Sequence, residues 1–431
     1  MEDEFSVPAR LGMKAFLARR WAVFIVAYVG YSACYFVRNN LVVVSDIMTK
    51  ELGWSAVAIG SILTGFAISY GLGKLIMGVI VDHLRLRHSF AGALAISAVL
   101  CILMSFQRDP AVFFLFLLAI GLVQGACAPA ALATIGAWYP AFQRGSRIGV
   151  WNTSQNVGAG TLAVIISASL AFAGPSQWHI AFWLPGLIAL ACSGLIFFVG
   201  GDRPWQEGMP TLKELYGSRA LPEVQVPADV SYWRLVRVNV VGNRTLLLLA
   251  TLNTFLYVLR FGILSWIPIF GSDVHAMSPH QSSVVITMFE WGAVPGALIF
   301  AWIALRHPWR VTIPAAVGIA VLSLLILAYA FAGTPVSVAA LALPMGALIY
   351  GPQIIINVLT VQFVSPRAVG VAIGWVGLGG YLVGAALANL SLPRIAESIG
   401  WTSGTVGLSV VGLACVFICI RLRRAERNAA V

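Results

Sequence analysis

The segment Tyr31-Ser-Ala-Cys-Tyr35-Phe-Val-Arg38-Asn-Asn40 places an arginine inside an apolar stretch, residues 21–45. An arginine in hydrocarbon costs at least about 2.5 to 3.5 kcal/mol, so its side chain is expected to face a protein interior or a watery cavity and to meet an anion. A second apolar stretch, residues 245–270, repeats the arrangement in Tyr257-Val-Leu-Arg260. Arg38 alone could snorkel to the membrane surface, but its recurrence as Arg260 favours two arginines that present their charges to one anion.

The composition is that of an integral membrane protein. Of the 431 residues, 59% are hydrophobic and only 10% are charged, whereas soluble domains carry about 25% charged residues. A helix that crosses ~30 Å of hydrocarbon needs about 20 apolar residues. Twelve windows qualify as membrane spans, and they are residues 21–45, 56–81, 89–107, 111–138, 148–173, 179–200, 245–270, 281–305, 311–332, 335–363, 369–393 and 402–420.

The distribution of basic residues predicts the topology. With twelve spans, 21 of the 27 lysines and arginines fall on the side that holds both termini, and three fall on the opposite side. This bias follows the positive-inside rule, so both termini are expected in the cytoplasm of a cell whose inner (plasma) membrane holds the chain. The net charge of +11 therefore reflects topology, and nucleic-acid binding is not expected. The acidic start, Met1–Glu4, gives no sign of a signal peptide, so the first span is expected to be retained.

No catalytic, metal-binding or cofactor-binding pattern is visible. Gly71-Leu-Gly73-Lys74-Leu75 lacks the glycine spacing and the Ser/Thr of a Walker A motif. The six histidines fall in loops or at the ends of spans, and the six cysteines lie inside apolar windows without metal-ligand spacing. The sequence therefore predicts neither an enzyme nor a cofactor.

Within the predicted spans, positively charged residues outnumber negatively charged ones. Arg38, Lys74 and Arg260 are the basic residues within spans, and Glu290 is the one acidic residue deep in a span. The surplus of positive charge predicts a dianionic ligand, because arginine forks match phosphate or carboxylate oxygens. Glu290 either pairs with a basic neighbour for structural reasons or takes part in proton coupling, and both interpretations are open. For Lys74, the alternative to a role in binding is a side chain that snorkels to the lipid headgroups.

Polar groups accompany these charges. Asn152, Gln155 and Asn156 cluster on one helical face, where they either join helices or line a cavity. Tyrosine hydroxyls can add hydrogen bonds to an anion. The predicted substrate-binding residues are Arg38, Arg260, Lys74, Tyr31, Tyr35, Gln155, Tyr257, Tyr350, Tyr381, Asn152 and Asn156.

The chain is predicted to consist of two related halves. Residues 201–243 form its one long polar segment, and this segment is interpreted as a cytoplasmic linker. The motif of Tyr35 and Arg38 before the linker is echoed by Tyr257 and Arg260 after it. Residues 1–200 and 244–431 are therefore expected to form two six-helix bundles, with the ligand site between them near the middle of the membrane, as in alternating-access transporters.

Several further motifs carry a family resemblance. They are Tyr31 to Asn40, Gly73-Lys-Leu-Ile-Met-Gly78, Val150-Trp-Asn-Thr-Ser-Gln-Asn-Val-Gly158, Arg203-Pro204 with Gly208-Met-Pro210, Tyr257-Val-Leu-Arg-Phe-Gly262, Met288-Phe-Glu-Trp291, Tyr350-Gly-Pro352 and Gly377-Leu-Gly-Gly-Tyr-Leu382. Nearly the whole chain resembles the organophosphate:phosphate antiporter family of the major facilitator superfamily, which includes glycerol-3-phosphate and hexose-phosphate transporters.

The resemblance implies an all-α polytopic membrane protein with 12 transmembrane helices in two pseudo-symmetric six-helix bundles. It also implies a rocker-switch carrier in which Arg38 and Arg260 grip the phosphate, Lys74 assists and the tyrosines line the path. Two positions depart from the family: Gln155 stands where histidine is common, and Ser265 stands where aspartate is usual. The resemblance therefore predicts recognition of phosphate but does not fix the organic part of the substrate. An organophosphonate or a phosphorylated carboxylate is also a candidate substrate.

The leading prediction is a monomeric secondary transporter in the lipid bilayer that takes up a phosphorylated organic anion in exchange for inorganic phosphate. Exchange removes the cost of moving an anion against an inside-negative potential, ~2.3 kcal/mol per charge per 100 mV. One alternative is a cation-coupled carboxylate or sugar-acid symporter, although that branch usually has aspartate before the first arginine, where this chain has Val37. Another is a transporter-like membrane sensor of sugar phosphates.

Overall fold

The computed structural model describes residues 7–217, 237–307, 310–364 and 369–429, and these residues form helices without strands. Residues 218–236 of the predicted linker lie outside the described residues. The first part of the chain contains α1 (Val7–Phe36), α2 (Asn40–Val43), α3 (Ser45–Leu52), α4 (Ala56–His83), α5 (Leu86–Met104), α6 (Pro110–Gln124), α7 (Cys127–Trp138), α8 (Ala141–Asn152), α9 (Ser154–Ala173), η1 (Pro175–Gln177), α10 (Ile180–Val199), η2 (Pro204–Glu207) and α11 (Leu212–Tyr216).

The second part contains η4 (Arg237–Val241), α13 (Arg244–Leu264), α14 (Ile267–His275), α15 (Pro279–Arg306), α16 (Thr312–Ala330), α17 (Pro335–Gln362), α18 (Val369–Gly379), η6 (Gly380–Ala385), α19 (Ala386–Ile399) and α20 (Trp401–Ala429). In the described residues, 11 helical segments are long and apolar enough to cross a membrane. The first of the twelve predicted spans is not among them. Its helix, α1, carries Arg19 and Arg20 beside the apolar stretch and ends at Phe36, before that stretch is complete.

Several predicted spans are interrupted helices. The span predicted over residues 111–138 divides into α6 and α7 at Gly125 and Ala126, and the span over 148–173 begins earlier, in α8, and breaks at Thr153. The span over 369–393 contains a π-helical stretch, η6. Such interruptions are tolerated in membranes where neighbouring helices cover the backbone, and they often occur at functional sites.

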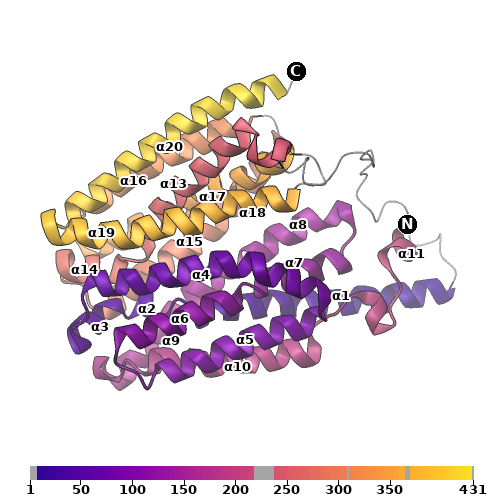
Figure 1. Ribbon diagram of the computed structural model, residues 1–431, viewed down its shortest axis with the longest axis horizontal. Coiled ribbons are helices and arrows are strands. Elements are labelled where there is room, and N and C mark those ends of the chain that lie inside the picture. Colours follow the sequence, from indigo (N-terminus) through magenta and orange to yellow (C-terminus); the bar gives the residue numbers. More distant parts are fainter. Residues whose placement is uncertain (1–6, 218–236, 308–309, 365–368, 430–431) are drawn as a thin grey trace.

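The helices of each half pack mainly on one another, and a smaller set of contacts joins the halves. In Figure 1, α13, α16, α17 and α20 lie in the upper part, and α5, α6, α9 and α10 lie in the lower part. Between them, α9 packs on α15 and α4 packs on α19. These contacts fit the predicted pair of bundles, although the boundaries at 200 and 244 remain a prediction.

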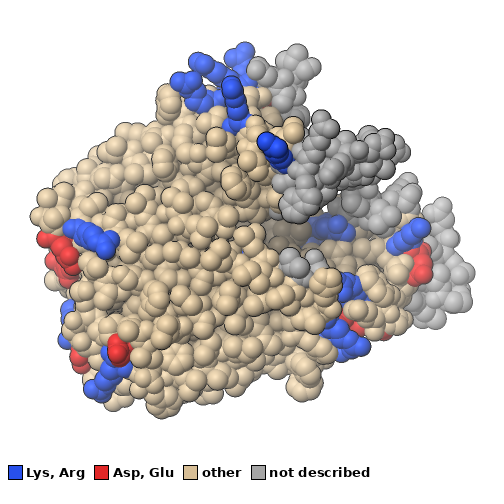
Figure 2. Space-filling model, in the orientation of Figure 1, with Lys and Arg blue, Asp and Glu red and all other residues tan. Residues whose placement is uncertain are grey.

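The two halves separate on one side of the molecule. The start of α1 and the end of α20 lie on the same, right-hand side in Figure 1, which we call the termini side. Figure 2 shows the surface hollowed between the halves on that side. On the opposite side α3 packs on α14, and the Lys50 ammonium donates a hydrogen bond of 2.6 Å to the Ser272 hydroxyl. The central region is therefore closed on the side opposite the termini.

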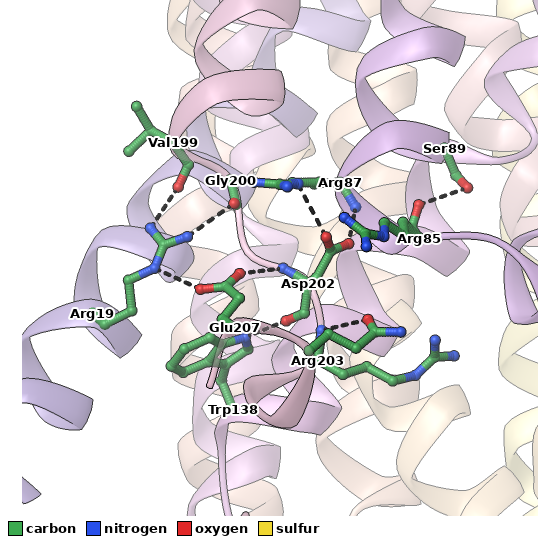
Figure 3. Close-up of polar contacts among 11 residues, drawn as sticks. Arg19, Arg85, Arg87, Ser89, Trp138, Val199, Gly200, Asp202, Arg203 and Glu207 are labelled. Atoms are coloured by element: carbon green, nitrogen blue, oxygen red, sulfur yellow. Dashed lines mark hydrogen bonds and ion pairs between the residues drawn. The ribbon is translucent and has the colours of Figure 1, made fainter. Parts of the chain in front are cut away.

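The beginning of the predicted linker is fastened to the first half. The Asp202 carboxylate lies 3.0 Å from the Arg87 guanidinium, and its backbone oxygen accepts a 2.7 Å hydrogen bond from the Trp138 indole. Glu207 pairs with Arg19 at 2.9 Å. Figure 3 shows these contacts converging on the turn that follows α10. Because Asp202 is only 1% exposed, this turn belongs to the folded bundle.

Candidate functional site

The structure brings Arg38 and Arg260 to one cavity. Arg38 lies in the break between α1 and α2, and Arg260 lies in the last turn of α13, just before the break at Ser265 and Trp266. The two side chains are only 5% and 4% exposed. Both line a cavity of about 40 Å³. At ~10–15 Å³ for each water molecule, this space holds about three waters, so the halves are close together around the arginines in this conformation.

The cavity wall is mostly aromatic and apolar. Its lining residues are Tyr35, Arg38, Asn39, Val42, Val43, Phe66, Ala159, Arg260, Phe261, Leu264, Ser265, Ile286 and Tyr381. Asn39 lies directly after Arg38 in the break after α1, and Ser265 lies five residues after Arg260 in the break after α13. Ser265 contributes a neutral hydroxyl to the cavity.

Aromatic rings hold both guanidinium groups in place. The guanidinium carbon of Arg38 lies 3.5 Å from the ring centre of Tyr35 and 4.8 Å from that of Tyr70. The guanidinium carbon of Arg260 lies 4.4 Å from the ring centre of Tyr350. A cation within about 6 Å of an aromatic ring face is attracted by the ring quadrupole. The rings orient the two cations without neutralising them.

Neither arginine has an anionic partner in the described part of the chain. The ion pairs recorded there join Arg19 to Glu207, Arg87 to Asp202 and Arg423 to Glu426. One nitrogen of each cavity arginine, Nη1 of Arg38 and Nε of Arg260, is buried without a hydrogen-bond partner. A buried charge normally needs a paired charge and hydrogen bonds. These unpartnered donors can therefore bind an anionic ligand with several acceptor oxygens.

Lys74 extends the positive region through a pair of tyrosines. Its ammonium lies 4.8 Å from the ring centre of Tyr70 and 5.1 Å from that of Tyr381. The Tyr381 ring also lines the arginine cavity. Lys74 thus points toward the tyrosines of the site, and the interpretation as a side chain that snorkels to the membrane surface is not supported.

Glu290 connects the two halves beside Arg260. The Asn156 amide, on α9, donates a 2.7 Å hydrogen bond to Glu290 Oε2, and the Tyr350 hydroxyl donates to the same oxygen at 3.2 Å. The Tyr350 ring in turn contacts the Arg260 guanidinium. The carboxylate accepts from both donors, which suits its ionised form. Glu290 therefore places an acidic side chain near the arginine site and ties α9 to α15 and α17.

Replacing Glu290 with glutamine is expected to strengthen phosphate binding and slow exchange. The amide keeps a similar shape, but it removes the charge with which ionised Glu290 competes with the ligand for Arg260, an effect of at least about 1 kcal/mol, or fivefold in affinity, at an effective dielectric constant of ~20. Equilibrium binding of radiolabelled phosphate and exchange rates in proteoliposomes measure the two effects. Glu397→Gln, at an exposed position, is the matched control. Weaker binding by the Glu290→Gln variant would contradict this role.

The other predicted residues are spread around this centre. Tyr35 donates a 2.9 Å hydrogen bond to Gln155, and the hydroxyl of Tyr31 lies 3.3 Å from that of Tyr70. The hydroxyl of Tyr257 accepts a 3.0 Å hydrogen bond from Gln353. Asn152, the last residue of α8, makes no side-chain hydrogen bond within the described ranges. The structure thus gathers all the predicted residues except Asn152 into one connected set, and their binding roles stay predictions.

Sequence reasoning missed two members of this set, Tyr70 and Gln353. Tyr70 contacts Arg38, Lys74 and the Tyr381 ring, with the two ring centres 5.2 Å apart. Its position four residues before Lys74 puts both on one helical face, and this spacing could have identified it. Gln353 follows the Tyr350-Gly-Pro352 motif directly, but no charge or periodicity marks it.

A buried carboxylate lies on the closed side of the molecule. Asp46, on α3, is fully buried, and no other side chain of the described residues donates a hydrogen bond to its carboxylate. Burial raises its pKa from 3.8 to about 6; the charge of Lys50 opposes this rise and that of Asp273, on α14, adds to it. Protonated Asp46 therefore fits the closed arrangement, and ionised Asp46 opposes it.

Exchange is expected to slow when the pH on this side falls below about 6. A carboxyl whose pKa is about 6 when closed and near 3.9 when hydrated favours closure about tenfold more at pH 5 than at pH 7. Asp46→Asn should remove this dependence. Phosphate changes charge in the same range, so the informative quantity is the ratio of wild-type to variant exchange rates between pH 5 and 8. A ratio that stays constant would contradict the expectation.

Comparisons with known proteins agree with this architecture. The sequence profile of the Major Facilitator Superfamily matches residues 27–389. The chain is 28% identical to the phosphoglycerate transporter protein of Salmonella typhimurium over 421 residues, which cover 93% of this chain and 90% of that protein. It is 28% identical to the hexose-6-phosphate:phosphate antiporter of Escherichia coli over 410 residues, which cover 91% of this chain and 88% of that protein.

Among solved structures, the fold is similar to that of a bacterial homolog of the human lysosomal transporter Spinster in an inward-facing, unoccupied conformation. The TM-score is 0.75 with 15% sequence identity, and the match covers 95% of this chain and 98% of that chain. The predicted fold class and the resemblance to organophosphate:phosphate antiporters are confirmed. Since the family profile spans most of its length, the chain belongs to the Major Facilitator Superfamily.

Proposed function

We propose that this protein is a secondary active transporter that takes up a phosphorylated organic anion in exchange for inorganic phosphate. The observation that carries the proposal is that Arg38 and Arg260, one from each half, line the same cavity. Among the described residues, no carboxylate lies within 4.0 Å of either guanidinium. Two planar guanidinium groups suit the oxygens of a phosphate, which accepts bidentate hydrogen bonds. The similar phosphoglycerate and hexose-phosphate transporters support this substrate class.

The residues around the arginines are assigned supporting roles. Lys74 adds a mobile positive charge, and Tyr35, Tyr257 and Tyr381 supply hydroxyl groups for the phosphate and its organic substituent. Glu290 limits the net positive charge, which keeps binding weak enough for release. In this proposal Asn156 and Tyr350 act through Glu290, and Gln155 orients Tyr35. No residue is assigned a catalytic or cofactor-binding role.

Transport is proposed to occur by alternating access. The contact of α3 with α14 closes one side, and the hollow on the termini side opens the other. If residues 1–200 rock against residues 244–431, the closed side would open and the open side would close, while the two arginines stay at the centre. We place the protein as a monomer in the inner membrane, with the termini side in the cytoplasm, in keeping with the excess of basic residues assigned to that side.

Proteoliposomes test the proposal directly. Vesicles loaded with phosphate should take up radiolabelled phosphate or glycerol-3-phosphate, whereas vesicles without an internal anion should not. Uptake driven by a proton gradient into vesicles without internal phosphate would instead indicate a cation-coupled symporter. Binding without any flux would indicate a sensor. Either of these results would overturn the exchange proposal.

A further inference from the structure

A second group of arginines lies around Tyr139, at the end of α7 on the termini side. The guanidinium carbon of Arg20, on α1, is 4.7 Å from the Tyr139 ring centre, and that of Arg147, on α8, is 5.6 Å from it. Arg147 is also 4.7 Å from the ring centre of Trp21. The two cations therefore flank one ring, and the separate helices α1 and α8 supply them.

Neighbouring groups fix these arginines but leave donors unused. Arg20 Nη1 donates to the Gln143 side chain at 3.2 Å, and Arg144 Nη2 donates to the backbone oxygen of Gly136 at 2.8 Å, near the end of α7. Four donor atoms in this small region are buried without a hydrogen-bond partner. They are Nε of Arg20, Nε of Arg144, Nε of Arg147 and the hydroxyl oxygen of Tyr139.

The group has no compensating negative charge among the described residues. Two other arginines of the first half do have one: Arg19 pairs with Glu207 and Arg87 pairs with Asp202 (Figure 3). Within the described part of the chain, no ion pair involves Arg20, Arg144 or Arg147. Arg20 is only 6% exposed and Tyr139 is fully buried, so water does not easily replace the missing partner. Three clustered positive charges with unused donors need an anion.

We propose that Arg20, Arg144, Arg147 and Tyr139 bind a phosphate-bearing anion, the headgroup of an acidic phospholipid or free phosphate. Guanidinium groups bind phosphate oxygens bidentately, and the start of α8 at Ala141 adds a favourable helix dipole. The 43% exposed Trp21 beside Arg147 is typical of the level of the lipid headgroups. This site is distinct from the central cavity, because α1 runs 16 residues, or about 24 Å, from Arg20 to its end at Phe36, before the break that holds Arg38.

The test uses full-length protein and two matched double variants. Arg20→Gln with Arg147→Gln removes two charges from the site, and Arg85→Gln with Arg424→Gln removes two from exposed positions. The proteins are placed in nanodiscs of phosphatidylcholine with or without phosphatidylglycerol, and retained lipid is counted by native mass spectrometry. Retention of phosphatidylglycerol should fall about fivefold for each arginine lost from the site, and it should stay at the wild-type level in the control.

Free phosphate is tested separately in an Arg260→Ala background, where the central cavity lacks one of its two arginines. Thermal stabilisation by inorganic phosphate in phosphatidylcholine nanodiscs, lost on adding Arg20→Gln and Arg147→Gln, would identify the free ion as the ligand. If the double variant does not fold, Tyr139→Phe removes one donor and should lower retention about twofold to fivefold. The proposal is overturned if neither phosphatidylglycerol nor phosphate distinguishes the site variants from the control.

Discussion

Replacing Arg38 or Arg260 with alanine is expected to abolish exchange in proteoliposomes. Each guanidinium is buried beside an aromatic ring and lines the shared cavity. Losing one partner of a buried, hydrogen-bonded charge pair costs about 2 to 5 kcal/mol, which is at least thirtyfold in affinity. The lysine variants should retain some binding, since they keep the charge but lose the planar fork. Uptake of radiolabelled phosphate into phosphate-loaded vesicles measures the loss.

The matched control is Arg394→Ala. This arginine is exposed, and its guanidinium bonds to a backbone oxygen of its own helix, that of Leu390, at 2.8 Å. The Arg394→Ala variant should exchange phosphate at the wild-type rate. Size-exclusion profiles of all variants must match that of the wild type, so that lost exchange reflects lost binding. Exchange that survives Arg38→Ala at a rate similar to the control would remove Arg38 from the site.

Gly346→Val is expected to prevent the chain from reaching its folded state. At Gly346, a Cβ atom would lie 1.8 Å from the backbone oxygen of Phe289, and at Gly292 it would lie 2.1 Å from that of Leu343. Helices α15 and α17 therefore touch backbone to backbone through small residues. A backbone contact cannot adjust as a flexible side chain can, so the helices would have to separate. Thermal unfolding and size-exclusion chromatography in detergent measure the effect.

Gly194→Val provides the comparison. Gly194 also lies inside a membrane helix, α10, but a Cβ atom there would have no neighbour within 4 Å. Valine is slightly better than glycine in a helix, so this variant should keep the wild-type melting temperature. Equal stability of the two variants would show that the tight packing of α15 on α17 does not support the fold.

Some of the site could be predicted because charge in an apolar segment is costly. Arg38, Arg260 and Glu290 were identifiable from that cost alone, and the structure places all three in one region. The tyrosine three residues before each arginine was also informative. Arg38 lies over Tyr35, and Arg260 has Tyr257 at 5.7 Å from its guanidinium carbon.

The remaining features depend on contacts between distant segments. The hydrogen bond from Asn156 to Glu290 joins residues 134 positions apart, and no local pattern indicates it. The interruptions of the helices were equally hard to predict. The break that carries Arg38 contains neither proline nor glycine, and tertiary packing rather than propensity determines its position. The arginines around Tyr139 were counted only as topology signals, because their convergence appears only in three dimensions.

The most direct test of the central claim is a double-mutant cycle on phosphate binding with Arg38→Lys and Arg260→Lys. If both side chains hold the same phosphate, their effects should not add. The cycle should then give a coupling energy of about 0.5 to 3 kcal/mol, the range found for residues that share a partner. Additivity within about 0.5 kcal/mol would mean that the two arginines act independently and would contradict a shared anion site between the halves.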